Sequence, residues 1–342
     1  MKKLVVFVLF VVVMGGAAAI ALYERVRQPY KGYEATEQFV EIPAGMKTGA
    51  MAGALASAGI VRDEPTFRLA LWMSGKGRHL QAGEYRFDRP MTPIEVVDKI
   101  ARGDVFTIPI TFPEGLTIAE MAKIFESSGF GPADSFVEAA SDVSLVHALD
   151  PAAKDLEGYL FPDTYALPRQ TDGPRLVRRM VTAFEHARTQ DIRDAATARK
   201  LSIRQLVTLA SIVEKETAKP DERPLVAAVY QNRLRIGMAL QCDPTVIYAL
   251  VERGRYNGNI HHDDLMIDSP YNTYRYPGLP PGPIAAPGRA AIEAAAHPAD
   301  VDFVYFVSRN DGSHAFARTL DEHNRNVQKY QIQYFRERRS NR

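Results

Sequence analysis

The stretch IPAGMKTGAMAGALASAGI, residues 42–60, decides the fold class because the chain repeats it as FPEGLTIAEMAKIFESSGF at residues 112–130. The two copies share the pairs Pro43/Pro113, Gly45/Gly115, Met51/Met121, Ala52/Ala122, Ser57/Ser127 and Gly59/Gly129. Each copy has the pattern of a strand, a Pro-x-Gly turn, an amphipathic helix and a terminating glycine. Two copies are too few for a solenoid. The repeat therefore predicts an α+β module that occurs twice; a chance recurrence of a common strand–turn–helix unit is the alternative.

The segment between the two copies completes a small domain. Residues 80–87 alternate polar and apolar side chains in the manner of a strand. Residues 92–103 have the pattern of a capped helix, with Thr92 at the N-cap, Pro93 at the first helical position and Gly103 beyond the end. The predicted domains are a small α+β domain at 38–110 and a larger one at 111–342, which begins with a connecting repeat module at 111–154.

The N-terminal residues predict a membrane segment. Residues 1–3 carry two lysines and precede an uncharged apolar run at 4–22. The run is close to the ~20 residues that cross a bilayer as a helix and exceeds the ~7–15 apolar residues of a signal peptide, so we favour an anchor. A cleavable signal peptide with a cut near 17–19 is the alternative. Residues 23–37 form a predicted tether, and basic residues flank the run on both sides, so charge alone does not fix the orientation.

The second half of the chain predicts a domain of mixed helices and strands. Apolar residues recur at helical spacing in several segments, and a turn-forming Asn-Asp-Gly lies between two short apolar strands. The predicted elements are helices at 173–190, 202–217, 224–236 and 321–338, a further helix from Asp243, and a hairpin about Asn310-Asp-Gly312.

Composition excludes several classes of function. Lysine and arginine number 42 against 41 aspartate and glutamate residues, so no basic excess predicts nucleic acid as a partner. The single cysteine, Cys242, cannot form an internal disulfide. The chain has no P-loop, no GxGxxG and no GxSxG motif. Residues 261–264, His-His-Asp-Asp, lack the paired spacing of a metal site, so we expect neither a metal nor a cofactor.

The stretch SIVEKET, residues 211–217, contains two candidate catalytic acids. A capping-box pattern starts its helix at Ser202. At about 100° per residue, Glu214 and Glu216 flank the apolar stripe of this helix, whereas Lys215 points to solvent. Both glutamates lie in the last turn. Burial and the negative end of the helix dipole each raise the pKa of a carboxyl group, which suits a general acid.

The residues around these two glutamates allow two interpretations, one structural and one catalytic. In one, they pair with cations such as Lys219 or Arg223 and only close the helix. In the other, one of them is a general acid. The residues one turn before Glu216 are Ile212 and Val213, which are more apolar than those before Glu214. These more apolar neighbours favour Glu216 as the acid.

A series of motifs connects the chain to a known family. In order, they are LEGYLFPDTY (156–165), ASIVEKET (210–217), NRLRIGM (232–238), LQCDPTVIY (240–248), YNTY (271–274), GLPPGPI (278–284) and AAAHPA (294–299). Together they resemble the endolytic murein transglycosylase family, also called YceG-like, over nearly the whole chain. Cys242 departs from this pattern, in which a residue such as threonine is expected, and we attach little functional weight to the difference.

The resemblance implies both an architecture and an activity. It implies a short cytoplasmic end, one anchor in the inner membrane of a Gram-negative-type cell, a LysM-like module at 38–110 and a periplasmic catalytic domain. Family members cleave peptidoglycan glycan strands internally, between N-acetylmuramic acid and N-acetylglucosamine, without water. The products carry 1,6-anhydro ends. The family's acid is the second glutamate of Glu-Lys-Glu-Thr, which is Glu216 here. The family also implies glycan polymerases as partners and a role in terminating nascent strands.

One carboxyl group suffices for this chemistry because the C6 hydroxyl of the muramic acid is the nucleophile, whereas most glycosidases need two carboxyl groups. Sugars pack on aromatic faces and hydrogen-bond to amides and carboxylates. The candidate substrate-binding residues are Glu157, Glu214, Gln241, Asp243, Tyr271, Asn272 and Tyr274. A rigid structural loop is the alternative for the tyrosines and Asn272, and an N-cap is the favoured interpretation of Asp243. His314 is expected to be a surface or structural residue.

Two other functions are compatible with the sequence. The chain could be a catalytically silent peptidoglycan-binding scaffold of the wall-synthesis machinery. It could also hydrolyse the same bond with water. The chemistry of the products separates these possibilities, because only a lytic transglycosylase leaves anhydro ends.

Overall fold

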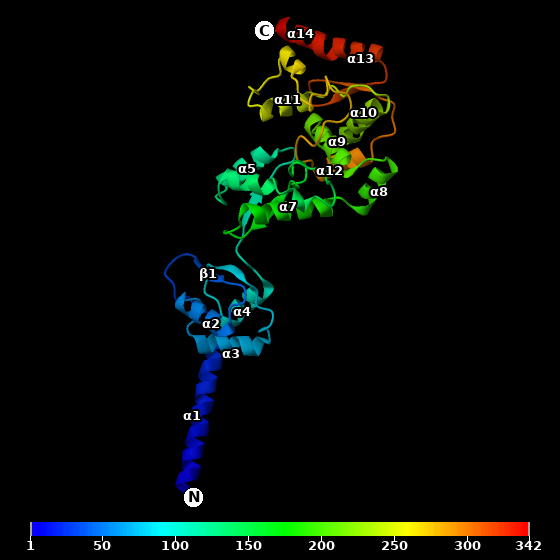
Figure 1. Ribbon diagram of the computed structural model, residues 1–342. Helices are drawn as coiled ribbons and strands as arrows, with labels where there is room; N and C mark the ends of the chain where they lie inside the picture. The colour runs from blue at the N-terminus through cyan, green and yellow to red at the C-terminus, as the bar shows by residue number, and fades with distance from the viewer. Residues whose placement is uncertain (1, 341–342) are drawn as a thin grey trace. The chain divides into compact units, whose positions relative to one another are not determined.

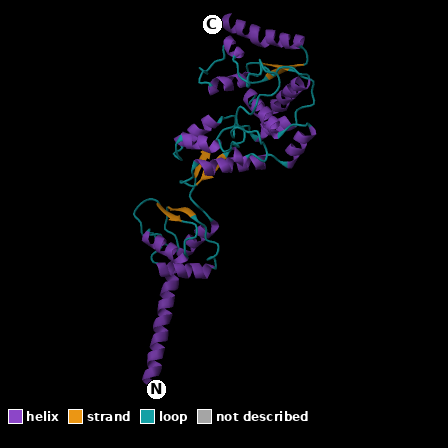
Figure 2. Cartoon of the chain, in the orientation of Figure 1, coloured by secondary structure: helices purple, strands orange, loops and turns teal. Residues whose placement is uncertain are grey.

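The computed structural model describes residues 2–340 (Figure 1). The chain folds into two compact units. The first holds the residues up to Pro109 together with Ala166–Arg169, and the second holds Ile110–Tyr165 and the residues from Gln170 onward. Helices and short two-stranded sheets make up the fold (Figure 2). This mixture confirms the predicted α+β class.

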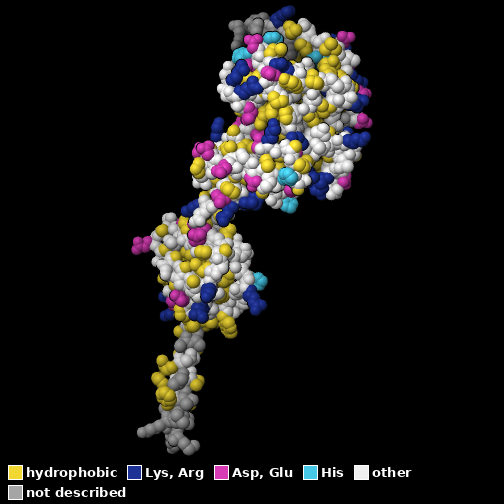
Figure 3. Space-filling view, in the orientation of Figure 1, with side chains coloured by type: hydrophobic (Ala, Val, Ile, Leu, Met, Phe, Trp, Pro, Cys, Tyr) yellow, Lys and Arg dark blue, Asp and Glu magenta, His cyan; other side chains and the backbone are white. Residues whose placement is uncertain are grey.

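The N-terminal helix α1 (Lys2–Arg27) contains the predicted anchor. Its described side chains include exposed hydrophobic ones (Figure 3). Phe7 and Val12 are two of them. The side chains at 2–6, 8, 11, 18 and 19 lie outside the described residues. A search of the described part of the chain finds no helix that is both long and apolar enough to span a membrane. The anchor at 4–22 is therefore not confirmed and stays a prediction.

The first unit is built on an antiparallel strand pair with helices packed against it. Its remaining elements are β1 (Gln38–Ile42), α2 (Thr48–Ser57), α3 (Glu64–Ser74), β2 (Gly83–Phe87) and α4 (Pro93–Arg102). β1 and β2 pair from Gln38 opposite Phe87 to Ile42 opposite Gly83. Their inward side chains and those of the helices form one hydrophobic core. α4 has the predicted capping box at Thr92 and ends at the left-handed Gly103.

The second copy of the repeat has the same element order as the first. Its strands and α-helices are β3 (Ile108–Thr111), α5 (Ile118–Ser127), α6 (Ala133–Ala140) and β4 (Thr164–Leu167), with a short 3₁₀ turn between α6 and β4, and β3 pairs with β4. Gly45 and Gly115 both have φ of 78° in the turn after the strand. Glycine adopts this left-handed conformation without a Cβ penalty. The repeat is therefore a strand–helix–helix–strand unit, whose second helix the sequence patterns did not predict.

The rest of the chain is mainly helical. Its elements are η1 (Val143–Leu145), α7 (Gly173–Ala187), α8 (Gln190–Ala198), α9 (Ile203–Glu216), η2 (Pro220–Glu222), α10 (Arg223–Arg235), α11 (Asp243–Glu252), η3 (His262–Met266), α12 (Arg289–Ala296), β5 (Tyr305–Ser308), β6 (His314–Ala317), α13 (Leu320–Val327), the π-helix η4 (Gln328–Gln333) and α14 (Tyr334–Ser340). The predicted hairpin is confirmed, because β5 and β6 pair antiparallel.

Helix α9 is the centre of the second unit. It packs against α10, α11 and α12, and every side chain from Leu206 to Val213 is buried. The expectation of a single apolar stripe was therefore wrong over these residues, because three helices and the loop residues near Ile284 together bury every side of this segment. The predicted helix 173–190 is also corrected. It ends at Ala187, and Thr189 caps the next helix, α8.

Candidate active site

Glu216 is the last residue of α9, and its helix is fixed at both ends. Ser202 and Gln205 form the predicted capping box at the start. At the other end, Thr217 leaves the helical conformation and its backbone N–H donates to the Val213 carbonyl. The segment from Leu206 to Val213 of this helix is buried. Glu216 follows three residues later and therefore lies at the edge of the protein core. Its side chain is partly buried there.

Two neutral side chains hold one oxygen of the Glu216 carboxyl group. The Tyr230 hydroxyl, from α10, donates to Oε1 at 2.6 Å. The Cys242 thiol, just before α11, donates to the same oxygen at 3.1 Å. Both donor side chains are buried, with exposures of 1% and 0%. The residue that departs from the family pattern, Cys242, therefore contacts the candidate acid.

The surroundings of Glu216 favour its protonated form. Burial raises the pKa of this carboxyl group, and the negative charge of Asp243 raises it further. The hydrogen bonds from Tyr230 and Cys242 and the charge of His314 act in the opposite direction, and the pKa remains raised on balance. A carboxyl group that keeps its proton toward neutral pH can act as a general acid.

Glu214, two residues earlier, has a different environment. Its Oε1 forms an ion pair with Arg223 at 3.2 Å, and its Oε2 accepts the Gly288 backbone N–H at 3.0 Å. The Glu214 side chain is only 6% exposed. Both oxygens are thus used within the protein, so the interpretation of a structural ion pair holds for Glu214. It does not hold for Glu216, whose direct hydrogen-bond partners are uncharged.

A second polar cluster adjoins Glu216 and was not predicted. The Glu222 carboxylate accepts the His314 backbone N–H at 2.9 Å and contacts His314 Nδ1 at 2.6 Å. The Thr217 hydroxyl donates to the same carboxylate at 3.3 Å. Through these hydrogen bonds, Glu222 connects the end of α9 with strand β6. His314 is therefore part of the surroundings of Glu216, and only its long separation in sequence hid this.

Two predicted site residues, Asp243 and Tyr274, interact with Glu216, and a third, Gln241, precedes Cys242 in the chain. Asp243 is the first residue of α11, and its carboxylate accepts the Tyr274 hydroxyl at 2.5 Å. The favoured interpretation of Asp243 as an N-cap is wrong, because Cys242 occupies that position. Gln241 is exposed and has a left-handed backbone with φ of 49°. Such a conformation is uncommon for a residue with a side chain and is enriched at functional sites.

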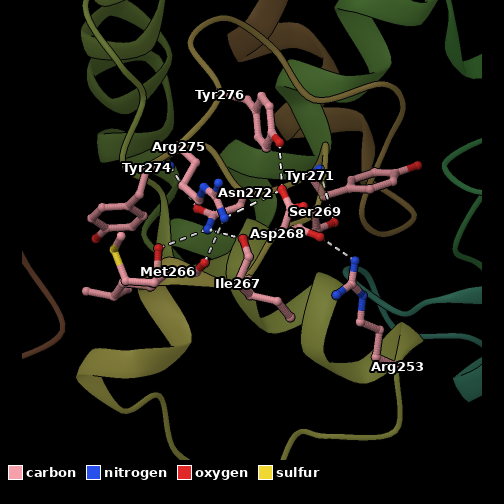
Figure 4. Close-up of polar contacts among 11 residues, drawn as sticks. Arg253, Met266, Ile267, Asp268, Ser269, Tyr271, Asn272, Tyr274, Arg275 and Tyr276 are labelled. Carbon is pink, nitrogen blue, oxygen red and sulfur yellow. Dashed lines mark hydrogen bonds and ion pairs between the residues drawn. The ribbon is translucent and has the colours of Figure 1, made fainter.

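The loop at 268–276 is folded by its own polar contacts (Figure 4). Asn272 is fully buried, and its side-chain N–H groups donate to the carbonyls of Leu265 and Ile267, both at 2.9 Å. Its side-chain oxygen accepts the Tyr274 backbone N–H at 3.0 Å. Both ends of the Asn272 side-chain amide are thus hydrogen-bonded to the backbone of this region. Asn272 therefore shapes the loop that holds Tyr274 near Asp243.

Glu157 and Tyr271 occupy a separate pocket. This pocket of about 50 Å³ is also lined by Asp150 and Arg204, which form an ion pair at 2.9 Å. Such a volume holds a few water molecules and is far below the ~300 Å³ of a typical ligand site. Burial raises the pKa of Glu157 to about 8, and its Oε2 accepts the Ile118 backbone N–H at 3.2 Å. The structure thus brings Asp243 and Tyr274 to Glu216 and places Gln241 beside Cys242, whereas Glu157 and Tyr271 lie in another pocket.

No group of three or more His, Cys, Asp or Glu side chains within residues 2–340 is arranged to hold a metal ion. Acidic and basic side chains are interspersed on the visible face of the molecule, without a continuous basic surface (Figure 3).

The fold and this site define a class of protein, namely a mixed α+β protein with one carboxyl group set among neutral donors at the end of a buried helix. The model of the YceG-like family matches residues 40–329. The chain belongs to this family.

Individual relatives agree with this assignment. The endolytic murein transglycosylase of Bacillus subtilis (strain 168) is 30% identical over 318 residues, which cover 89% of this chain and 87% of the relative. The protein of the same name from Streptococcus pneumoniae (strain D39) is also 30% identical, over 84% of this chain and 57% of the relative. The crystal structure of a yceG-like protein from Listeria monocytogenes matches with a TM-score of 0.58 and 31% identity, over 84% of this chain and 98% of that one.

Proposed function

We propose that the chain is an endolytic lytic transglycosylase. It cleaves the bond between N-acetylmuramic acid and N-acetylglucosamine within peptidoglycan glycan strands and leaves 1,6-anhydro ends. The observation that carries the proposal is the Glu216 carboxyl group, whose pKa is raised by burial and whose direct partners are neutral. The relatives from Bacillus subtilis and Streptococcus pneumoniae are named endolytic murein transglycosylases, which supports the class of reaction.

The reaction uses Glu216 twice. First, its O–H bond breaks as the proton passes to the glycosidic oxygen, and the C1–O bond breaks with its electron pair on the leaving sugar. Next, the C6 hydroxyl oxygen of the muramic acid bonds to C1, and its proton returns to Glu216. No water is consumed, and the enzyme ends in the protonation state in which it began.

This cycle accounts for the composition of the site. Most enzymes that hydrolyse glycosidic bonds use a second carboxyl group as base or nucleophile. Glu214, the other glutamate of the motif, is already engaged with Arg223 and the Gly288 N–H. The Asp243 carboxylate accepts the Tyr274 hydroxyl and acts on Glu216 through its charge. An internal nucleophile supplied by the substrate fits a site in which the raised pKa belongs to Glu216 and neither Glu214 nor Asp243 contacts it directly.

Mass spectrometry of glycan fragments tests the proposal. The full-length chain and Glu216→Gln are each incubated with purified peptidoglycan, and circular dichroism verifies that both are folded. New 1,6-anhydro ends from the unaltered chain alone would support the reaction and the acid. Reducing ends would mean that water is the nucleophile. Bound but uncleaved glycan would favour the scaffold, and anhydro ends from Glu216→Gln would remove Glu216 from the mechanism.

We also propose a setting for this reaction. Residues 4–22 anchor the chain in the inner membrane, the LysM-like domain at 38–110 positions glycan, and the catalytic domain acts in the periplasm beside glycan polymerases and terminates nascent strands. The uncharged apolar run within α1 and the family assignment support this setting. Membrane fractionation of the full-length chain against a chain lacking residues 1–22 provides a test. Recovery of the full-length chain in the soluble fraction would contradict the anchor.

A further inference from the structure

We propose that Tyr230, assisted by Cys242, is a positioning residue that confines the acidic proton of Glu216 to the carboxyl oxygen Oε2. The inference rests on the proposed function, and it identifies which oxygen of the acid reacts with the sugar. It also gives a role to the one cysteine of the chain, which differs from the residue expected in the family.

The geometry assigns the two carboxyl oxygens different tasks. Tyr230 and Cys242 both direct their hydrogens to Oε1, at 2.6 and 3.1 Å. An oxygen that accepts two hydrogen bonds has both of its lone pairs engaged, so it cannot also carry the acidic proton. Oε2 has no hydrogen-bond partner within the described part of the chain. The proton must therefore reside on Oε2, the oxygen left free to meet a substrate.

Packing fixes both donors. The Tyr230 ring is 1% exposed and lies edge-on to Phe306, with 5.9 Å between ring centroids. Cys242 is fully buried, and its backbone N–H donates to the Thr273 hydroxyl at 3.0 Å. Neither donor can follow the carboxyl group if it turns. Oε1 is consequently held in one place, and rotation of the carboxyl group would break two hydrogen bonds.

Both donors keep their hydrogens at neutral pH. Burial raises the pKa of the Tyr230 hydroxyl and that of the Cys242 thiol well above their usual values. The other charged or titratable groups that interact with Glu216 come from four elements. They are Asp243 at the start of α11, Tyr274 in the loop before α12, Arg233 on α10 and His314 on β6.

The arrangement suits a group that must act first as acid and then as base. In the proposed cycle, Oε2 releases the proton to the glycosidic oxygen and recovers a proton from the C6 hydroxyl. The carboxylate formed between these steps carries negative charge, and the two donors on Oε1 stabilise that charge without supplying a proton. Neither Tyr230 nor Cys242 needs to move. Such fixed donors are typical of electrostatic preorganisation in enzyme sites.

The test is a titration of the Glu216 carboxyl group in the substrate-free, full-length chain. Glutamate labelled with ¹³C at the side-chain carboxyl is incorporated, and the Glu216 resonance is assigned by its loss in Glu216→Gln. Tyr230→Phe keeps the ring and its packing but removes the donor. We expect the pKa of Glu216 to rise in this variant, because its ionised form loses a hydrogen bond. The alkaline limb of kcat/KM should move to higher pH, with a fall in kcat of about tenfold.

Matched variants separate positioning from a general loss of packing. Cys242→Ala should also raise the pKa of Glu216, whereas Cys242→Ser, which restores a donor, should return it toward the original value. Tyr165→Phe is the control, because this buried hydroxyl donates to the Phe161 carbonyl and not to Glu216. It should leave the titration unchanged.

An unaltered pKa of Glu216 in a folded Tyr230→Phe chain would overturn the inference. The failure of the proposed function would look different. In that case Glu216→Gln would still produce anhydro ends, whatever the titration of Tyr230→Phe gave.

Discussion

Glu214 and Glu216 stand two residues apart on α9, and their partners give them different chemistry. Glu214 meets a guanidinium and a backbone N–H, which suit a carboxylate. Glu216 meets a hydroxyl and a thiol in a buried setting, which suit an acid that gains and loses a proton. The sequence could rank the two only by the apolar residues one turn earlier. The deciding partners come from α10, the start of α11 and the residue before α12, and no spacing within the motif indicates them.

The pKa of Glu157 leads to a prediction about stability. Burial raises this pKa to about 8, whereas a glutamate in an unfolded chain has a pKa of about 4.3. Between these values the folded chain retains a proton that the unfolded chain has lost. The contribution of Glu157 to the free energy of unfolding is therefore fully present below about pH 4, and it is lost as the pH rises through about 8. Glu157→Gln removes that loss, and its amide oxygen can still accept the Ile118 N–H.

We expect Glu157→Gln to be more stable than the unaltered chain by about 3 kcal/mol at neutral pH. The difference should be absent near pH 4, grow up to about pH 8 and stay level above it. Urea unfolding across this range measures it. Glu293→Gln, at an exposed position of α12, should change stability by less than about 0.5 kcal/mol. A difference that does not vary with pH would show that Glu157 is ionised in the folded chain.

At the scale of elements, the repeat supplies an internal comparison. Helix α5 starts with a capping box formed by Thr117 and Glu120. The matching helix α2 has Lys47 at its N-cap, without a side-chain hydrogen bond, and Ala50 at the third position. Lys47 and Ala50 are exposed, so substitution there disturbs no packing. The first copy thus lacks a stabilising contact that the second copy has.

Transfer of this capping box should stabilise the first copy. We expect Lys47→Thr combined with Ala50→Glu to add about 1 kcal/mol to the free energy of unfolding, because two unpaired N–H groups gain acceptors and the positive N-terminus of α2 loses a lysine. Thermal unfolding measures the gain. Lys47→Ala removes the same charge without adding a cap, so an equal gain from that variant would assign the effect to charge alone.

The elements predicted best from sequence are those with strong local signals. The capping boxes at Thr92 and Ser202 and the Asn-Asp-Gly hairpin all occur as expected. Helix α12 was not predicted, because half of its eight residues, RAAIEAAA, are buried alanines, and its only large apolar side chain is Ile292. The break between α7 and α8 was also missed. It depends on Thr189, whose hydroxyl caps α8 in a segment that otherwise continues the helical pattern.

At the scale of the whole molecule, the sequence indicated the fold class, the family and the candidate acid, but not the surroundings of that acid. Helix α9 was expected to expose one face, whereas the chain around it buries every side chain from Leu206 to Val213. Asn272 was a candidate for substrate contact, yet it is buried and holds its own loop. Motif residues identify a region of chemistry, whereas burial decides which of them can act there, and burial depends on the assembled fold.

The division into two compact units leads to the last prediction. The first unit has its own hydrophobic core, which contains Leu55, Phe67 and Tyr85, and the second is organised around α9. Because separate cores can unfold separately, we expect calorimetry of the chain to resolve two transitions. The Lys47→Thr/Ala50→Glu variant, which has the added capping box, should raise only the midpoint temperature of the transition that belongs to the first unit.

At neutral pH, Glu157→Gln should raise only the midpoint temperature of the second unit's transition, because Glu157 and its partner Ile118 both belong to that unit. The two variants therefore assign each transition to its unit, and the double variant should show both shifts added, as expected for independent sites. A single transition that both variants move together would mean that the units unfold as one. In that case a change in the first unit would also alter the stability of the helix that carries Glu216.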